Sequence, residues 1–168
     1  MLKCEKKVEK EHKYLIDEEQ LKEIVAASFE SMSIIQGYIS DNVRVRNNAS
    51  NRTSCITLKG ERVKDERVEY TYEIPYSHGL EIVNSMAYGI IYKTRYFIKS
   101  DYEPSYIWEV DIFHGYNSGL IIAEIEIGQQ YNYKFPKWMG SVKEVTMDER
   151  YYNSYLSKKP FCYWDSIL

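Results

Sequence analysis

Residues 8–16 have the sequence VEKEHKYLI, in which charged and apolar side chains alternate. Successive side chains of a β-strand point to opposite sides, so Glu9, Glu11 and Lys13 would share one face. The same period of two returns later in the chain. We expect further strands at residues 39–47, 55–59, 67–75, 91–98, 107–113 and 120–128. This alternation predicts a fold that is mainly β.

Three helices are expected between these strands. The first would begin after Asp17, where Gln20 completes a capping-box pattern, and end near Met32. The others would cover residues 78–87 and the segment after Asp148. We expect turns at residues 47–52, 60–66, 99–104 and 115–119, a loop at 129–141, and packing of the apolar tail at 160–168. Short turns favour antiparallel pairing, and roughly seven or eight strands must close or form a sandwich to protect their edges.

Composition places the chain among soluble globular proteins. The 168 residues are 44% hydrophobic and 28% charged, with a net charge of −3, which predicts one domain over residues 1–168. This profile excludes a disordered chain and a nucleic-acid binder that works by bulk charge. Three cysteines without metal-ligand spacing argue against a disulfide framework or a Cys-type zinc site. Without a signal peptide or a membrane-spanning run, the expected location is the cytoplasm.

Most predicted strands carry charge on one face and apolar side chains on the other. The charges are sorted by sign: Arg44 and Arg46 are both cationic, whereas Glu124 and Glu126 are both acidic. A solvated face of an open sheet is the usual meaning of such alternation. Like charges two residues apart repel each other, however, so a ligand should neutralise them. Acidic pairs suit Mg²⁺ or Mn²⁺, and cationic pairs suit phosphate oxygens. A closed barrel with this face inward would form a charged tunnel.

The charged strands also form a recognisable series of motifs. The series comprises Glu9-Lys10-Glu11-His12-Lys13, Gln36-Gly37-Tyr38-Ile39, Val43-Arg44-Val45-Arg46, Thr57-Leu58-Lys59, Arg67-Val68-Glu69-Tyr70, Lys93-Thr94-Arg95-Tyr96, Trp108-Glu109-Val110-Asp111, Ala123-Glu124-Ile125-Glu126 and residues 144–151. In this order it resembles the CYTH superfamily, the triphosphate tunnel metalloenzymes, and most of all compact bacterial members that hydrolyse inorganic triphosphate. The resemblance implies an α+β, mainly β fold: a closed eight-stranded antiparallel barrel with a charged lumen and helices packed outside. The motif-bearing core would cover about residues 8–156, with a tail at 159–168.

The resemblance also implies roles for individual side chains. Carried over by position, it gives Glu9, Glu11, Glu124, Glu126 and Asp111 as ligands of Mg²⁺ or Mn²⁺; Lys13, Arg44, Arg46, Lys59, Lys93, Arg95 and Arg150 as triphosphate-binding residues; and Glu9, Glu11, Lys13 and Glu69 as catalytic residues. One position departs from the family pattern, because Thr71 stands where a second glutamate is common.

The expected function is metal-dependent hydrolysis of tripolyphosphate, or another small triphosphate, to phosphate and pyrophosphate. Its partner would be the small-molecule substrate, with no nucleic acid or membrane, and the protein would be a monomer or homodimer. Two alternatives stay open: a class IV-type adenylate cyclase that makes cyclic AMP from ATP, and a non-catalytic triphosphate-binding module. Thiamine triphosphate as a specialised substrate also stays open. The sequence lacks a P-loop motif, which excludes that route to phosphate binding.

Overall fold

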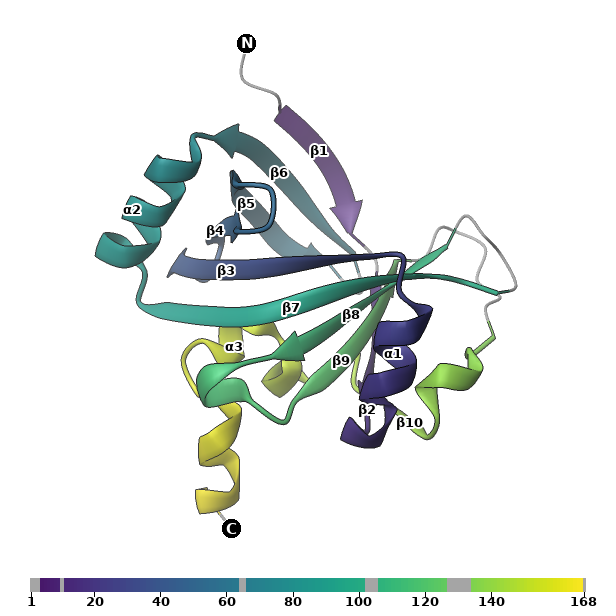
Figure 1. The fold of residues 1–168 in the computed structure, drawn as a ribbon. Helices are drawn as coiled ribbons and strands as arrows, with labels where there is room; N and C mark the ends of the chain where they lie inside the picture. The colour runs from purple at the N-terminus through teal and green to yellow at the C-terminus, as the bar shows by residue number, and fades with distance from the viewer. Residues whose placement is uncertain (1–3, 10, 64–65, 102–105, 127–133, 168) are drawn as a thin grey trace.

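The computed structural model describes residues 4–9, 11–63, 66–101, 106–126 and 134–167, with the side chains of all except residues 8, 9, 62, 66 and 165–167. These residues form one antiparallel sheet with short helices around it (Figure 1). The strands are β1 (Cys4–Glu9), β2 (Glu11–Ile16), β3 (Glu30–Ser40), β4 (Val43–Asn48), β5 (Thr53–Val63), β6 (Glu66–Ile74), β7 (Gly89–Lys99), β8 (Ile107–Phe113), β9 (Ile121–Glu126) and β10 (Val142–Glu144). The α-helices are α1 (Leu21–Ala27), α2 (Tyr76–Met86) and α3 (Asn153–Leu156). The 3₁₀ helices are η1 (Glu18–Gln20), η2 (Gly115–Asn117), η3 (Lys137–Met139), η4 (Glu149–Tyr151) and η5 (Phe161–Ile167).

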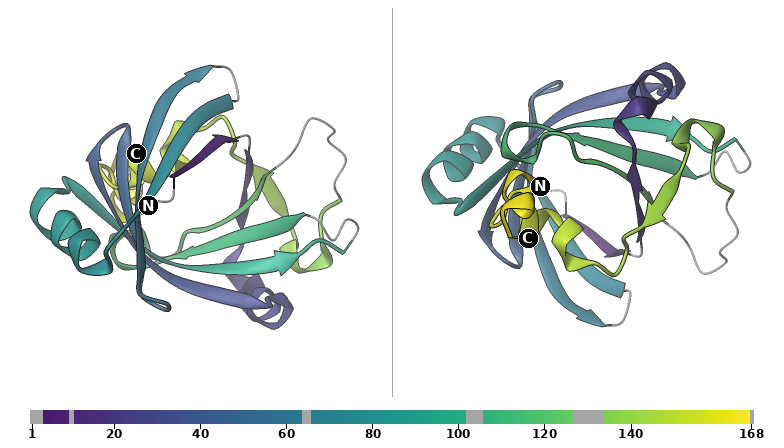
Figure 2. Two further views of the ribbon diagram at one scale, coloured as in Figure 1. Left: turned by 90° about the horizontal axis from the view of Figure 1, so that it is seen from above. Right: turned by 90° about the horizontal axis from the view of Figure 1, so that it is seen from below.

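The sheet curves around an interior, as the end-on views of Figure 2 show. Its strand order is β1-β6-β5-β4-β3-β7-β8-β9-β2-β10. The predicted mainly β, antiparallel architecture is confirmed, but the closed eight-stranded barrel is not, because the described sheet has ten strands with β1 and β10 at its ends. The strand expected at residues 8–16 is divided in two. Its first part pairs with β6 and its second part with β9, so it contributes near both ends of the sheet.

Several predicted boundaries are wrong. The first helix ends at Ala27 rather than near Met32, because residues 30–38 pair with β7 as part of β3. Tertiary pairing here overrides local helical preference. The turn expected at residues 60–66 is largely strand, since β5 continues to Val63 and β6 begins at Glu66. The helix expected after Asp148 is divided into η4 and α3. Asp17 makes no side-chain cap, so the capping box is not formed. Of the loop expected at 129–141, residues 129–133 lie outside the described residues, and the described remainder contains η3.

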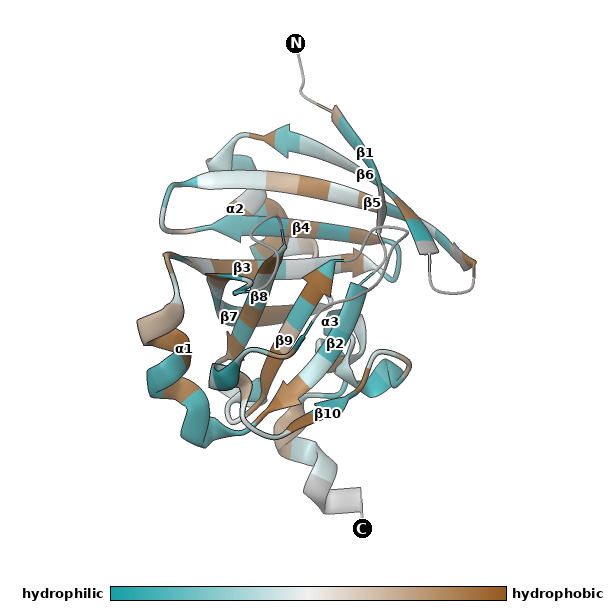
Figure 3. Cartoon of the chain, turned by 90° about the vertical axis from the view of Figure 1, so that its right-hand side faces the viewer, coloured by the Kyte–Doolittle hydropathy of each residue, from teal (hydrophilic) through white to brown (hydrophobic). Residues whose placement is uncertain are grey.

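The main hydrophobic core lies on the outer face of the sheet. Trp108, Val110 and Ile125 are fully buried there, against Ile24 of α1 and Met139 of η3. Figure 3 shows apolar and polar residues alternating along the strands, which is the pattern of a sheet with two chemically different faces. Because the helices take up the apolar face, the charged side chains point into the curve of the sheet.

A second core closes one end of that interior. Phe113 and Ile122 of the sheet pack with Tyr151 and Leu156, and Trp164 of the tail packs against the same cluster. The tail therefore packs onto the sheet, as expected from its apolar character. In the part of the chain that the structure describes, no helix is long and apolar enough to cross a membrane.

Candidate active site

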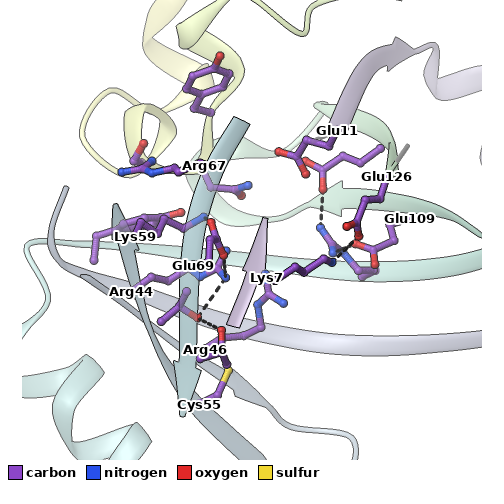
Figure 4. Close-up of a pocket in the computed structure, with 18 of the residues that line it drawn as sticks. Lys7, Glu11, Arg44, Arg46, Cys55, Lys59, Arg67, Glu69, Glu109 and Glu126 are labelled. Atoms are coloured by element: carbon purple, nitrogen blue, oxygen red, sulfur yellow. Dashed lines mark hydrogen bonds and ion pairs between the residues drawn. The ribbon is translucent and has the colours of Figure 1, made fainter. Parts of the chain in front are cut away.

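A cavity of about 270 Å³ occupies the charged concave side of the sheet. Figure 4 shows its walls, which carry cations and carboxylates from most of the strands. The predicted site residues that line it are Glu11, Lys13, Arg44, Arg46, Lys59, Glu69, Arg95, Glu124 and Glu126. Strand register explains the gathering, because each of these side chains belongs to the inward-pointing set of its strand.

Lys13 is held between two carboxylates on the β2–β9 side of the cavity. It is paired across the ladder with Glu124 and forms a buried ion pair with it. Its Nζ also lies 2.5 Å from Oε1 of Glu11. Burial opposes the charge of Lys13, but the two carboxylates outweigh burial and hold its pKa above the ordinary value. The pKa of Glu124 is held low, since Lys13 and Arg95 outweigh the opposing effect of burial. Lys13 and Glu124 are therefore both charged at neutral pH.

Arg44 and Arg46 stand side by side on β4, facing the cavity. Repulsion from Arg44, together with burial, lowers the pKa of Arg46 to about 10. Arg44 Nη2 lies 3.4 Å from Thr57 Oγ1 and 3.9 Å from Glu69 Oε2. Among the residues that the structure describes, Arg46 Nε is buried and has no hydrogen-bond partner. These two guanidinium groups repel each other, and the buried Nε–H of Arg46 has no acceptor among the described residues. Together they form a candidate binding site for an anion.

Glu69 and Thr71 follow each other along the inner face of β6. Glu69 is buried and forms an ion pair with Lys59, its neighbour across the ladder. The hydroxyl of Thr71 lies 3.1 Å from that of Thr57. The position where the family commonly has a second glutamate therefore contributes a neutral hydroxyl pair, which leaves more net positive charge beside Arg44.

Lys93 and Asp111 lie beneath the cavity wall rather than in it. Both side chains have no solvent exposure, and Nζ lies 2.5 Å from Oδ2 of Asp111. Burial lowers the pKa of Lys93 to about 7, and Asp111 opposes the shift. Asp111 also receives two hydrogen bonds from Arg95, and together these cations outweigh burial and hold its pKa low.

Several acidic side chains of the cavity could serve as ligands of a divalent metal. Glu11, Glu124 and Glu126 lie on the adjacent strands β2 and β9, and Glu109 of β8 is opposite Glu124. Each is close to a cation: Glu11 and Glu124 to Lys13, Glu126 to Lys7, and Glu109 to Arg95. Within the described part of the chain, no three His, Cys, Asp or Glu side chains form a ready ligand cluster. The donors are all carboxylate oxygens, which fit Mg²⁺ or Mn²⁺, and Mg²⁺ commonly takes one or two carboxylates and completes its shell with substrate phosphates.

Comparison with known proteins agrees with this geometry. The chain is 42% identical over 132 residues to the inorganic triphosphatase of Acetivibrio thermocellus, a match covering 75% of this chain and 80% of that protein. The chain belongs to the inorganic triphosphatase family of the CYTH superfamily. No family profile matches it.

Solved structures of this family share the fold. The crystal structure of the inorganic triphosphatase NE1496 superposes with a TM-score of 0.59 at 26% identity, covering 89% of this chain and 93% of that one. HpAC1 from Hippeastrum, whose structure is described with a dominant triphosphatase activity, has a TM-score of 0.52 at 15% identity. That match covers 72% of this chain and 80% of HpAC1, and it shows the fold alone.

Besides Lys93 and Asp111, two more predicted site residues of this inorganic triphosphatase family member are not placed in the cavity. The side chain of Glu9 lies outside the described residues, although its backbone in β1 is paired with Arg67. Arg150 follows Asp148 at the surface, with 56% of its side chain exposed, and Nη2 lies 2.6 Å from Oδ2 of that aspartate. Their roles remain predictions from the resemblance.

Other cavity residues were missed by the sequence analysis. Tyr38 is buried in the wall, and burial raises its pKa to about 12, so its hydroxyl stays protonated. Lys7 continues the alternation that begins at Glu9, a signal that could have identified it. Asn153 and Ser154 come from α3, and no pattern along the sequence places that helix beside the strands.

Proposed function

We propose that the protein hydrolyses inorganic triphosphate to phosphate and pyrophosphate in this cavity. The observation that carries the proposal is the Arg44–Arg46 pair, in which Arg46 has a lowered pKa and a buried donor without a partner among the described groups. A polyanion bound there would relieve the repulsion and satisfy the donor. Family membership supports the same substrate, since the relative from Acetivibrio thermocellus is named an inorganic triphosphatase.

Binding would depend on cations from several strands. Arg44, Arg46 and Lys59 line one side of the cavity, whereas Lys13 and Arg95 line the other. Lys13 and Arg95 already carry carboxylate partners that fix their positions, so they would meet the substrate without large rearrangement. Preorganised charge of this kind is the main source of catalysis in phosphoryl transfer, where little covalent chemistry is required of the protein.

Glu11, Glu124 and Glu126 would hold the divalent metal, together with Glu9 as the family resemblance implies. When bound, Mg²⁺ or Mn²⁺ would neutralise phosphate charge and lower the pKa of a water molecule. Lys13 keeps Glu11 and Glu124 in position and helps to hold the pKa of Glu124 low. Because its own pKa is raised, Lys13 acts as a fixed cation toward the phosphate oxygens and not as a base.

Glu69 is the carboxylate on the arginine side of the cavity. It accepts from Lys59 and lies within 3.9 Å of Arg44, so two cations fix its position. We propose that it orients the water that attacks the terminal phosphorus. The hydroxyl of Thr71, at the position of the second family glutamate, would then form a hydrogen bond with the same water.

We further propose that the curved sheet closes into a tunnel around the substrate. β1 pairs with one end of the curved sheet and β2 pairs near the other, and only residue 10 separates them in sequence. A continuous strand across this point would join the two ends and give the family barrel. It would also exclude water from the cavity walls, which strengthens the electrostatic interactions inside.

Product analysis separates the candidate activities. Ion chromatography after incubation with tripolyphosphate and Mg²⁺ should show phosphate and pyrophosphate in equal amounts. Incubation with ATP should give no cyclic AMP; its formation would instead support the cyclase alternative. Tight binding of tripolyphosphate in calorimetry without either product would support a binding module.

A further inference from the structure

Helix α3 brings side chains to the cavity from outside the sheet. Asn153 and Ser154 line the cavity together with Arg44, Arg46 and Lys13. Figure 1 shows this helix at the end of the sheet where the C-terminal segment packs. The motif series assigned no function to α3.

The amide of Asn153 is oriented by a buried lysine. Nζ of Lys93 lies 3.3 Å from Oδ1 of Asn153. The ion pair with Asp111 favours the charged form of Lys93, and an ammonium group can only donate hydrogen bonds, so the atom facing it is the amide oxygen and not the nitrogen. This contact settles which way the carboxamide points. Lys93 lies beneath the wall and Asn153 lines the cavity, so the Nδ2 donors are turned away from Lys93, toward the cavity.

The backbone around Asn153 is held in place by packing in the second core and by hydrogen bonds on either side of α3. Leu156 is fully buried in the second core. Lys158 Nζ lies 2.5 Å from Oδ1 of Asp41, and the hydroxyl of Tyr88 donates to the same oxygen at 3.0 Å. The hydroxyl of the neighbouring Tyr152 donates a hydrogen bond to the carbonyl oxygen of Thr146 at 3.0 Å. Asn153 is thus presented on a fixed element, which lowers the entropy cost of using it in binding.

We propose that Asn153 is a substrate-binding residue whose Nδ2 donates a hydrogen bond to a phosphate oxygen of the triphosphate. The inference rests on the proposed function and adds a neutral donor from α3 to the cationic wall. It also gives Lys93 a positioning role: the lysine orients the Asn153 amide and does not itself line the cavity. The resemblance had placed Lys93 directly on the substrate.

Two substitutions separate this role from simpler ones. Asn153→Asp keeps an oxygen acceptor for Lys93 but replaces the donor with a carboxylate that faces the substrate. Asn153→Ala removes both donor and acceptor without adding charge. Asn84→Asp is the matched control, because it adds the same charge on an exposed position of α2.

We expect both Asn153 variants to bind tripolyphosphate more weakly. Loss of a hydrogen bond to a charged group should raise KM about tenfold in Asn153→Ala, and roughly 10- to 100-fold in Asn153→Asp, with kcat changed less than KM. Asn84→Asp should behave as wild type. The melting temperature of Asn153→Asp should stay near the wild-type value, because its contact with Lys93 is kept.

Two outcomes would overturn the inference. If Asn153 only anchored α3, Asn153→Asp would keep the wild-type KM while Asn153→Ala lost affinity and thermal stability. If only charge in the cavity mattered, Asn153→Ala would bind as well as wild type. Calorimetric titration with tripolyphosphate repeats the comparison without turnover. A wild-type protein that bound tripolyphosphate but did not hydrolyse it would contradict the proposed function and leave the Asn153 comparison intact.

Discussion

Arg95 holds Asp111 by two parallel hydrogen bonds across the β7–β8 ladder: Nε lies 2.7 Å from Oδ1, and Nη2 lies 2.7 Å from Oδ2. Lys93 contacts the same carboxylate, whose side chain has no solvent exposure. Asp111 is therefore a buried anion shared by Lys93, which lies beneath the cavity wall, and Arg95, which lines the cavity. This arrangement favours a structural role for Asp111 over the metal-binding role that the resemblance implied.

The first prediction follows from that balance. Asp111→Asn should lower the free energy of unfolding by about 3–5 kcal/mol, because it leaves the charge of Lys93 buried without its carboxylate partner, while Arg95 keeps Glu109 and Glu124. Urea denaturation measures the loss. Glu109→Gln is the control: it also removes a carboxylate from Arg95, but the Glu109 side chain is 39% exposed, so a smaller loss is expected. Unchanged stability of Asp111→Asn with a raised Mg²⁺ requirement would instead identify a metal ligand.

The second prediction concerns the repelling arginines. Arg46→Gln should stabilise the free protein by on the order of 1 kcal/mol, because it removes the repulsion from Arg44 that lowers the pKa of Arg46. The same substitution should weaken tripolyphosphate binding. Thermal unfolding with and without tripolyphosphate tests both effects: the variant should melt higher alone and gain less from the ligand. Lys22→Gln removes the same charge from the exposed side of α1 and should do neither. A variant less stable than wild type would show that Arg46 is satisfied in the free protein.

A third prediction addresses Glu11. Glu11→Gln should reduce kcat for tripolyphosphate by roughly 100-fold or more, because it removes a charged oxygen ligand and releases one side of Lys13. The melting temperature should change little. Glu144→Gln, on β10 with half of its side chain exposed, provides a control outside the cavity. Full activity of Glu11→Gln would exclude Glu11 from the reaction.

The fourth prediction concerns the ion pair between Lys158 and Asp41, which tethers the chain directly after α3. The pKa of Asp41 is lowered, chiefly by its hydrogen bond from Lys158, and the pKa of Lys158 is raised by the same bond. The ion pair therefore adds stability at every pH between the ordinary pKa values of Asp and Lys. That stability is lost in acid, when Asp41 becomes protonated, and in strong base, when Lys158 loses its proton. From about pH 5 to pH 9 it should be constant.

Hydrogen exchange of residues 153–158 tests the tether. In Asp41→Asn these amides should exchange a few-fold faster than in wild type at pH 7, and Lys159→Gln, which leaves the pair intact, should show no change. Equal protection in both variants would mean that the second core alone holds α3.

Alternation along the strands was sufficient to predict which side chains share the inner face. Lys13, Arg44 and Glu124 obey the period of two, and all three line the cavity. The same period could not predict how deeply each of these side chains is buried. Lys93 and Asp111 obey it equally well, yet they are fully buried beneath the wall, where Lys93 contacts Phe113 of the second core and Asn153 of α3.

Features that depend on long-range packing were not predictable from local patterns. Residues 30–38 have no strong alternation of charge, and pairing with β4 and β7 makes them a strand. Asn153 reaches the cavity because a tail more than 100 residues from β4 packs against the sheet. Arg150 fits the family motif in sequence but is paired with Asp148 at the surface, a contact that spacing alone does not exclude.

The measurement that tests the central claim most directly is phosphate release from tripolyphosphate by the purified protein, with Mg²⁺, with Mn²⁺ and with a chelator, beside ATP and pyrophosphate. The account predicts rapid, metal-dependent release from tripolyphosphate, little from ATP and none from pyrophosphate. No release from tripolyphosphate with either metal, under conditions in which the protein is folded, would contradict it.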